Sequence, residues 1–179
     1  MDDVADGICK KMIYRHPHVF GTAQVETSED VLVSWDALKQ KEKHQTTTTD
    51  SLVSVARSLP GLIRAEKVQH KAAKVGFDWD DISGALDKVR EETEEVTRAL
   101  QGQGDPSEEL GDLLFAVVNV ARFLKTDPEE AIAHTTDKFI RRFAQVEQAA
   151  SQAGKQLSEM SLVEMDALWD AAKAKERGV

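Results

Sequence analysis

The sequence has little of what builds secreted or membrane proteins. A single cysteine, Cys9, among 179 residues excludes an internal disulfide and a zinc site built from cysteines. No stretch approaches the ~20 uninterrupted apolar residues of a membrane-spanning helix. The first residues, MDDVADG, also lack the basic and apolar regions of a secretory signal. We therefore expect a cytoplasmic protein without a membrane partner.

Basic residues are scarce relative to acidic ones, and the imbalance is local. The chain has 32 Asp and Glu against 23 Lys and Arg, for a net charge of −9. A negative surface disfavours nucleic acid, whose phosphates attract basic patches, so we expect no nucleic-acid partner. Residues 78–112 hold twelve acidic and three basic side chains, which equals the whole net charge of the protein. This segment is where we look for a function.

Strand signals are also lacking, while apolar residues recur at helical spacing almost throughout. We expect an all-α fold, a helical bundle of long antiparallel helices. Starts are marked by Asp105-Pro106 and Asp127-Pro128, each an N-cap before a proline, and by the capping box of Ser161 and Glu164. The helices are expected at residues 3–14, 28–43, 60–75, 80–100, 105–124, 127–153 and 161–175.

One polar stretch divides the chain. Residues 39–50, KQKEKHQTTTTD, have no apolar side chain to anchor them, and we interpret them as a flexible linker. The division leaves residues 1–50 as a small N-terminal part and residues 51–179 as the main helical domain. The segment KMIYR at 11–15 resembles KFIRR at 138–142, which on its own is a weak indication of an internal repeat.

The acidic segment places carboxylates on two neighbouring helices. Glu92 and Glu95 share one face of the helix at 80–100, and Glu91 lies one turn from Glu95. Glu109 and Asp112 are spaced i, i+3 on the next helix. A short loop with glycines and a proline joins the two helices, so they should form an antiparallel hairpin in which the acidic pairs face each other.

Converging carboxylates repel one another unless a cation neutralises them. The glutamates of the first helix show no evident lysine partners, and the second pair borders a strongly apolar run. Oxygen ligands select Mg²⁺, with Mn²⁺ as a substitute, over zinc. The alternative is a solvated acidic face, which is the usual fate of a lone EExxE motif. The two pairs together favour a metal site.

Several other side chains are candidates for ligand contact. Asn119 lies i+7 from Asp112, where it either orients a ligand or satisfies a backbone group. Lys138, Arg141 and Arg142 form a compact cationic patch on one helix, suited to a polyphosphate or simply solvated. Trp169, four residues before a lysine, is a base platform or a core side chain.

At this point the residues resemble a known family. EExxE at 91–95, a thirteen-residue gap and ExxD at 109–112 are similar to the signature of the MazG nucleoside triphosphate pyrophosphohydrolases. The similarity continues in order along essentially the whole chain. It includes RHPHVFG at 15–21, SLPGLIRAEKVQ at 58–69, VGFDW at 75–79, EELGDLLFAVVNVAR at 108–122 and KFIRRF at 138–143.

The resemblance implies an all-α nucleotide pyrophosphatase fold, Mg²⁺ dependence and a homodimer. It also implies hydrolysis of a nucleoside triphosphate, ATP among them, to the monophosphate and pyrophosphate. By position, Glu92, Glu95, Glu109 and Asp112 match the metal ligands of the family. Positions that contact nucleotide or phosphate are matched by Lys88, Glu91, Glu108, Asp112, Lys138, Arg142, Trp169 and Lys173.

Roles follow from that match. Glu91 and Glu92 are the expected catalytic residues, with Glu91 as general base or as the group that orients the water. Lys88, Lys138 and Arg142 would stabilise charge on the phosphates, and Trp169 would stack on the base. Such contacts recognise the triphosphate more than the base, so we expect broad tolerance of nucleotides.

The chain departs from its longer relatives in one respect. Longer MazG proteins carry two tandem repeats, and RHPHVF marks the end of the first. We therefore expect residues 1–50 to contain only the tail of the first repeat, which explains the likeness of 11–15 to 138–142. Related pyrophosphatases acting on dUTP or phosphoribosyl-ATP are alternatives, as is a non-catalytic helical module for dimerisation or regulation.

Overall fold

The computed structural model describes residues 2–22, 27, 31, 35, 38, 42 and 46–177. Every regular element in these residues is helical, so the all-α prediction is confirmed. The N-terminal helices are α1 (Asp2–Arg15), α2 (Pro17–Phe20) and α4 (Thr48–Val53). The remaining helices are α5 (Gly61–Ala73), α6 (Ile82–Leu100), α7 (Pro106–Phe123), α8 (Pro128–Gln152), the 3-10 turn η1 (Leu157–Glu159) and α9 (Leu162–Arg177).

The helix starts follow the expected capping chemistry. The side chain of Asp105 accepts a hydrogen bond from the Ser107 N–H ahead of α7, and Asp127 does the same for two N–H groups of α8. At α9, the Glu164 carboxylate accepts from the backbone and hydroxyl of Ser161, which in turn accepts from the Glu164 N–H. The capping box predicted there is confirmed.

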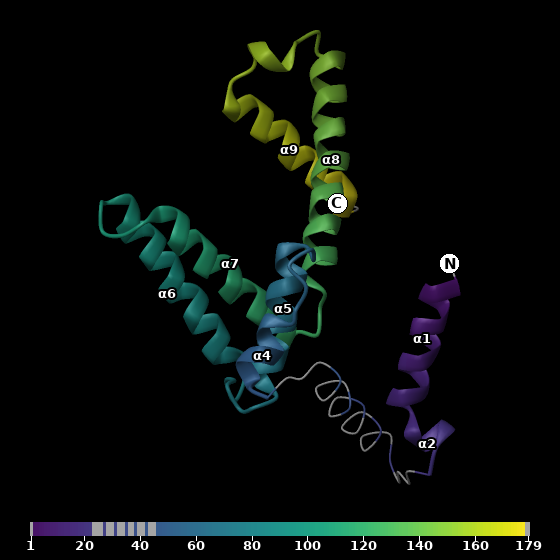
Figure 1. Ribbon diagram of the computed structural model, residues 1–179. Helices are drawn as coiled ribbons and strands as arrows, with labels where there is room; N and C mark the ends of the chain where they lie inside the picture. Colours follow the sequence, from purple (N-terminus) through teal and green to yellow (C-terminus); the bar gives the residue numbers. More distant parts are fainter. Residues whose placement is uncertain are drawn as a thin grey trace. The chain divides into compact units, whose positions relative to one another are not determined.

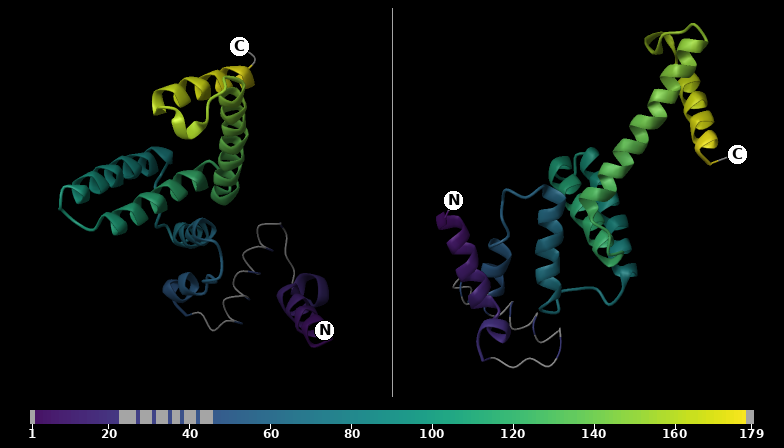
Figure 2. Two further views of the ribbon diagram at one scale, coloured as in Figure 1. Left: turned by 90° about the horizontal axis from the view of Figure 1, so that it is seen from above. Right: turned by 90° about the vertical axis from the view of Figure 1, so that its right-hand side faces the viewer.

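The chain forms two compact units, one of residues 1–59 and 67–79 and the other of residues 60–66 and 80–179. In the second unit, α6 and α7 lie side by side as an antiparallel hairpin, and α8 and α9 form another hairpin (Figures 1 and 2). These units group residues by contact, so the expected domain division at residue 50 stays a prediction.

The two hairpins are held by small buried side chains. Ala85, Ala99 and Ala116 are almost fully buried in α6 and α7, together with Val118. In α8, Val146 and Ala150 are buried in the same way. Small side chains let two helix backbones approach closely, which fixes the face that α6 turns toward α7. The acidic face of α6 is thereby positioned relative to α7.

The prediction that residues 39–50 form a flexible linker is wrong for the last of these residues. Residues 39–41 and 43–45 lie outside the described residues, but α4 begins at Thr48. The Thr47 hydroxyl accepts from the Asp50 N–H at 3.1 Å, while the Asp50 carboxylate accepts from the Thr47 N–H at 2.9 Å. Threonines suggested flexibility, yet here they supply a helix cap.

The helix expected at residues 28–43 also falls mostly outside the described residues. The described positions within it, Val31, Trp35, Leu38 and Glu42, are helical. Three short elements had no counterpart in the sequence analysis: α2, α4 and η1. Each is one or two turns long, which is too short to show helical periodicity.

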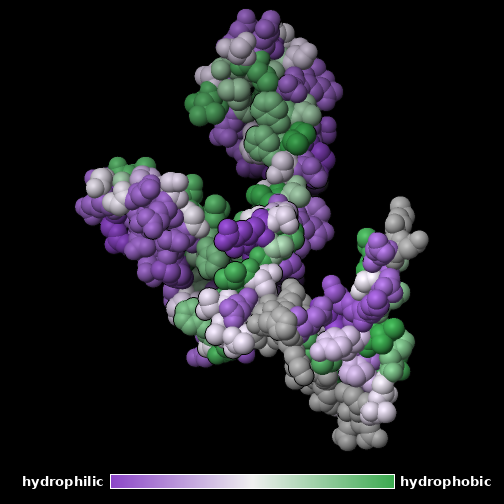
Figure 3. Space-filling model, viewed as in Figure 1, coloured by the Kyte–Doolittle hydropathy of each residue, from purple (hydrophilic) through white to green (hydrophobic). Residues whose placement is uncertain are grey.

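Many large apolar side chains remain on the surface. Figure 3 shows hydrophilic surface over α6 and hydrophobic patches over the α8–α9 hairpin. On α7, Leu110 and Leu114 are each 49% exposed and Val117 is 47% exposed. Within the described residues, no helix is long and apolar enough to cross a membrane.

Candidate metal and nucleotide site

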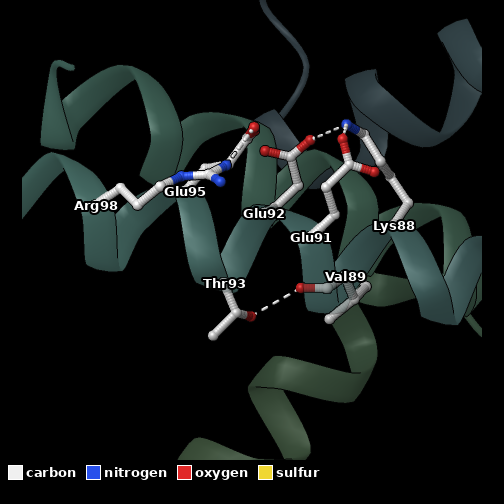
Figure 4. A network of polar contacts seen from close by, with 7 residues as sticks. All are labelled: Lys88, Val89, Glu91, Glu92, Thr93, Glu95 and Arg98. Carbon is white, nitrogen blue, oxygen red and sulfur yellow. Dashed lines mark hydrogen bonds and ion pairs between the residues drawn. The ribbon is translucent and has the colours of Figure 1, made fainter. Parts of the chain in front are cut away.

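The glutamates of α6 differ in how far they are buried. Glu92 is buried, with 3% of its surface exposed, whereas Glu95 is half-buried and Glu91 is exposed. Figure 4 shows Glu92 and Glu95 on one side of the helix and Thr93 on the opposite side. This arrangement follows from 3.6 residues per turn, which puts positions i and i+3 on one face.

Basic partners sit beside these glutamates, contrary to the sequence expectation. Lys88 Nζ lies 2.9 Å from Glu91 Oε1 and 2.5 Å from Glu92 Oε1 (Figure 4). Arg98 Nη2 lies 2.9 Å from Glu95 Oε1. Lys88 lies four residues before Glu92, and Arg98 lies three residues after Glu95. Both spacings place a cation next to a carboxylate on the same face of the helix. The statement that this helix lacks lysine partners is therefore wrong.

The ammonium of Lys88 responds to this environment. Its hydrogen bonds to Glu92 and then to Glu91 raise the pKa of Lys88 well above its ordinary value, against a smaller opposing effect of burial. The lysine therefore remains charged at neutral pH. It supplies one positive charge to Glu91 and Glu92, which both lie on α6.

The α7 side of the site is shaped by the tight turn that precedes it. Gly104 has φ of 123°, a conformation that favours glycine. A Cβ at this position would lie 3.2 Å from Glu109 Oε1. Partial burial raises the pKa of Glu109, and the negative charges of Glu95 and Asp112 raise it further. Glu109 is thus aimed at the other carboxylates.

The carboxylates converge as the hairpin geometry predicts. Oxygen atoms of Glu91, Glu92 and Glu95 lie within 4.8 Å of one another, and so do those of Glu92, Glu109 and Asp112. Glu92 belongs to both groups, and the second group joins α6 to α7. The convergence is confirmed, while the role of these residues as metal ligands stays a prediction.

Glu92 provides the test of whether these residues fit a cation. Its Oε1 accepts from Lys88, but its Oε2 is buried without a hydrogen-bond partner in the protein. A buried, unpartnered carboxylate oxygen is costly unless a cation or a water binds it. Hard oxygen donors of this kind suit Mg²⁺ or Mn²⁺. The donor set and the orphaned oxygen both fit the predicted ion.

The basic and aromatic candidates gather on the other hairpin. The guanidinium carbon of Arg142, on α8, lies 5.9 Å from the ring centroid of Trp169, on α9. Arg142 Nε donates to Glu176 Oε2 at 2.8 Å. The half-buried Lys138 lies one turn before Arg142, and Lys173 pairs with Asp170 at 2.7 Å. Arg142 and Trp169 are therefore in contact, while their role in nucleotide binding stays a prediction.

The positions of Glu108 and Asn119 say less about a role in ligand binding. Glu108 is exposed in the first turn of α7, next to Glu109. Asn119 accepts hydrogen bonds from Arg122 Nε and Nη2 at 3.0 and 2.8 Å. The sequence analysis missed Arg98 and Glu176. Arg98 was detectable from its i+3 spacing to Glu95, whereas the contact of Glu176 with Arg142 crosses between helices and leaves no local signal.

A helical hairpin that carries converging carboxylates, in a chain whose second hairpin pairs arginine with tryptophan, defines an all-α protein with a candidate cation and nucleotide site. A family model of the MazG nucleotide pyrophosphohydrolase domain matches residues 82–147, which span α6, α7 and most of α8. This match covers the acidic cluster and Arg142.

Whole proteins extend the likeness. The chain is 40% identical over 179 residues to the nucleoside triphosphate pyrophosphohydrolase of Escherichia coli K12, covering 98% of this chain and 68% of that protein. It is 35% identical to the nucleoside triphosphate pyrophosphohydrolase/pyrophosphatase MazG of Thermotoga maritima, covering 97% and 66% of the two chains. An uncharacterised Bacillus subtilis protein, YabN, is 48% identical, covering 99% of this chain and 37% of that protein. The chain belongs to the MazG family, so the predicted membership is confirmed.

Proposed function

We propose that this protein hydrolyses nucleoside triphosphates to the monophosphate and pyrophosphate, using Mg²⁺. The observation that carries the proposal is the buried Glu92, which is shared by both carboxylate groups and has one unpartnered oxygen. Membership of the MazG family and the names of the two pyrophosphohydrolase relatives support the same activity.

The metal would be held by Glu92 and Glu95 of α6 and by Glu109 and Asp112 of α7. When bound, Mg²⁺ or a substituting Mn²⁺ neutralises phosphate charge and lowers the pKa of a coordinated water. The triphosphate carries about four negative charges and cannot approach an acidic cluster unaided. The carboxylates therefore select a cation first and the nucleotide with it.

Glu91 would accept the proton of the attacking water. It is exposed and adjoins Glu92, so it can reach bulk solvent and the cluster together. Lys88 holds Glu91 Oε1 at 2.9 Å and thereby orients the carboxylate. Lys88 would contact phosphate, as the family resemblance implies, if a bound cation compensated Glu92 in its place.

The second hairpin would bind the rest of the nucleotide. Arg142 and Lys138 supply donors for phosphate oxygens, and Lys173 extends that basic edge from α9. The ring of Trp169 is half-buried and keeps an exposed part on which a base can stack. Glu108 is a further candidate for contact with the nucleotide or its phosphates. Stacking tolerates any base, so we propose broad use of nucleotides.

A homodimer accounts for the apolar surface of α7. Leu110, Leu114 and Val117 follow i, i+4, i+7 spacing and form one stripe that is about half exposed. Apolar stripes of this kind pack against another element, and we propose a second copy of the chain. Leu114→Lys should then shift the mass measured by light scattering from dimer to monomer. A monomeric wild-type protein would contradict the dimer and leave the hydrolase proposal intact.

The activity is tested by its products. With Mg²⁺ and any of the common ribo- or deoxyribonucleoside triphosphates, monophosphate and pyrophosphate should appear in equal amounts, without a diphosphate. Asp112→Asn should abolish the release, because it removes a proposed ligand while keeping side-chain size. Diphosphate and orthophosphate as first products would overturn the proposal. Strict preference for dUTP or phosphoribosyl-ATP would favour those related enzymes.

A further inference from the structure

Two basic side chains of α6 lie on the same face of that helix as its carboxylates. Lys88 Nζ is 2.5 Å from Glu92 and 2.9 Å from Glu91, so one ammonium bridges two carboxylates (Figure 4). Arg98 Nη2 is 2.9 Å from Glu95. The three glutamates form the carboxylate group that belongs to α6 alone, with oxygens within 4.8 Å of one another. Each carboxylate of this group therefore already has a cationic partner.

A role in helix stability explains the spacing of these cations but not where they point. Pairs three or four residues apart stabilise an exposed helix, and Arg90 with Asp87 forms such a pair on α6, with side chains 69% and 73% exposed. Lys88 instead contacts a carboxylate that is 4% exposed, and Arg98 contacts one that is 32% exposed. Both cations therefore reach into the acidic cluster, where a bound ion would otherwise neutralise the charge.

The carboxylate group that joins α6 to α7 lacks this compensation. Within the described residues, no ion pair reaches Glu109 or Asp112. Glu92, the third member, gives Oε1 to Lys88 and keeps Oε2 buried without a hydrogen-bond partner. A buried oxygen of this kind requires a cation or a water. The free protein therefore offers a divalent ion one open position, between the two helices.

We propose that Lys88 and Arg98 are resident counter-ions, which keep a second divalent ion off α6 until a polyphosphate binds. The proposal rests on the proposed function, because it takes the carboxylates as metal ligands and a triphosphate as the substrate. The phosphates would attract both cations, and a second ion would replace them on Glu92 and Glu95. Two side chains of charge +1 and one divalent ion carry the same charge, so the exchange keeps the carboxylates compensated. Glu91 loses its ammonium partner in the same exchange, which leaves it able to accept a proton.

The two cations are free enough to change partners. Their side chains are 39% and 50% exposed, so they can leave the carboxylates without disturbing the helix. Ion pairs with this exposure are weak, whereas ammonium and guanidinium groups form charge-assisted hydrogen bonds with phosphate oxygens, arginine through two at once. Polyphosphate and the second ion should therefore strengthen each other's binding, and by linkage to the same extent.

The test counts the ions bound to the whole chain and does not depend on turnover. Mn²⁺ is titrated into the protein, and the unbound ion is measured by electron paramagnetic resonance. The wild type is compared with Arg98→Gln and with the double variant Lys88→Met/Arg98→Gln, which removes both counter-ions. Arg90→Gln is the matched control, because Arg90 belongs to the same helix but pairs with Asp87, outside both carboxylate groups. Circular dichroism verifies that each variant is helical.

We expect one tightly bound Mn²⁺ in the wild type and in Arg90→Gln, and two in the double variant. Arg98→Gln alone should tighten the binding of a second ion about tenfold, because one charge-assisted hydrogen bond no longer competes. This single variant decides the question if the double variant is not helical. A triphosphate analogue with a methylene group between the α- and β-phosphorus should raise the wild-type count to two, after correction for ions held by free analogue.

The outcomes separate this inference from the function on which it rests. Two ions on the wild type without nucleotide, or one ion on a helical double variant, would overturn the counter-ion role and leave the proposed function standing. Unchanged affinity for the second ion in Arg98→Gln would equally overturn it. No bound ion in any of the four proteins would overturn the metal site of the proposed function, and the counter-ion role with it.

Discussion

Glu92→Gln should remove the stabilisation that Mg²⁺ gives to this protein. A ligand that binds only the folded state stabilises it by about 2.7 kcal/mol at a hundredfold excess over its dissociation constant. For a chain of this size, each kcal/mol raises the melting temperature by about 2–4 °C, so the wild type should gain about 5–11 °C. Glutamine cannot replace the anionic oxygen that both carboxylate groups share, so the variant should gain almost nothing.

The metal-free variant should melt close to the metal-free wild type. Breaking a buried ion pair often costs about 3–5 kcal/mol, because one charge is left buried and unpaired. Here the Lys88 side chain is 39% exposed and also contacts Glu91, so its charge keeps a partner and water. The substitution also relieves repulsion with Glu109. We therefore expect a change of less than about 1 kcal/mol without metal.

The assay is thermal unfolding with MgCl₂, and with NaCl at matched ionic strength, for three proteins. Glu94→Gln is the matched control, because Glu94 is an exposed glutamate of the same helix that belongs to neither carboxylate group. It should keep the full Mg²⁺ shift. An undiminished shift in Glu92→Gln, or no shift in the wild type, would refute the reasoning from the buried oxygen.

Three further predictions follow from the two hairpins. Lys138→Ala and Arg142→Ala should mainly raise KM and lower kcat/KM about ten- to a hundredfold, because phosphate charge is present before the transition state; wild-type steady-state kinetics would contradict this. Gly104→Ala should destabilise by about 1–3 kcal/mol in urea unfolding, because its φ is 123°, whereas Gly111→Ala, in open space within α7, should not. The hydrogen bond that Lys155 donates is the main cause that lowers the pKa of Glu164 from 4.5 to about 2. The ionised Glu164 therefore stabilises the folded protein fully above pH 4.5. The melting-point loss in Glu164→Gln should therefore shrink as the pH falls from 4.5 toward 2, and a constant loss would contradict the prediction.

Local sequence patterns predicted most of the helices. The caps of α7, α8 and α9 use Asp105, Asp127 and Ser161, each readable because capping depends on residues within one helical turn. The polar residues near Thr47 misled because the same threonines suit a flexible linker and a helix cap. A decision between the two depends on the Asp50 contact, which composition does not encode.

The ion pairs of the acidic helix show the same limit at the site. Spacing alone placed Glu92 and Glu95 on one face. The pairing of Lys88 with Glu92 and of Arg98 with Glu95 was not predicted, although each pair lies within about one helical turn. The sequence also could not grade burial. That Glu92 is the buried member and Glu91 the exposed one follows from how α6 packs on α7.

The sequence by itself determined the helical class, the family and the set of carboxylates, because helical periodicity and ordered motifs are local properties of the chain. Only the tertiary structure decided that Glu92 is shared by both carboxylate groups and keeps an unpartnered oxygen. Only the structure, too, paired Arg15 with Glu42 and Arg142 with Glu176 through the same atoms. These contacts join residues 27 and 34 positions apart, and no local rule specifies which distant side chains will meet.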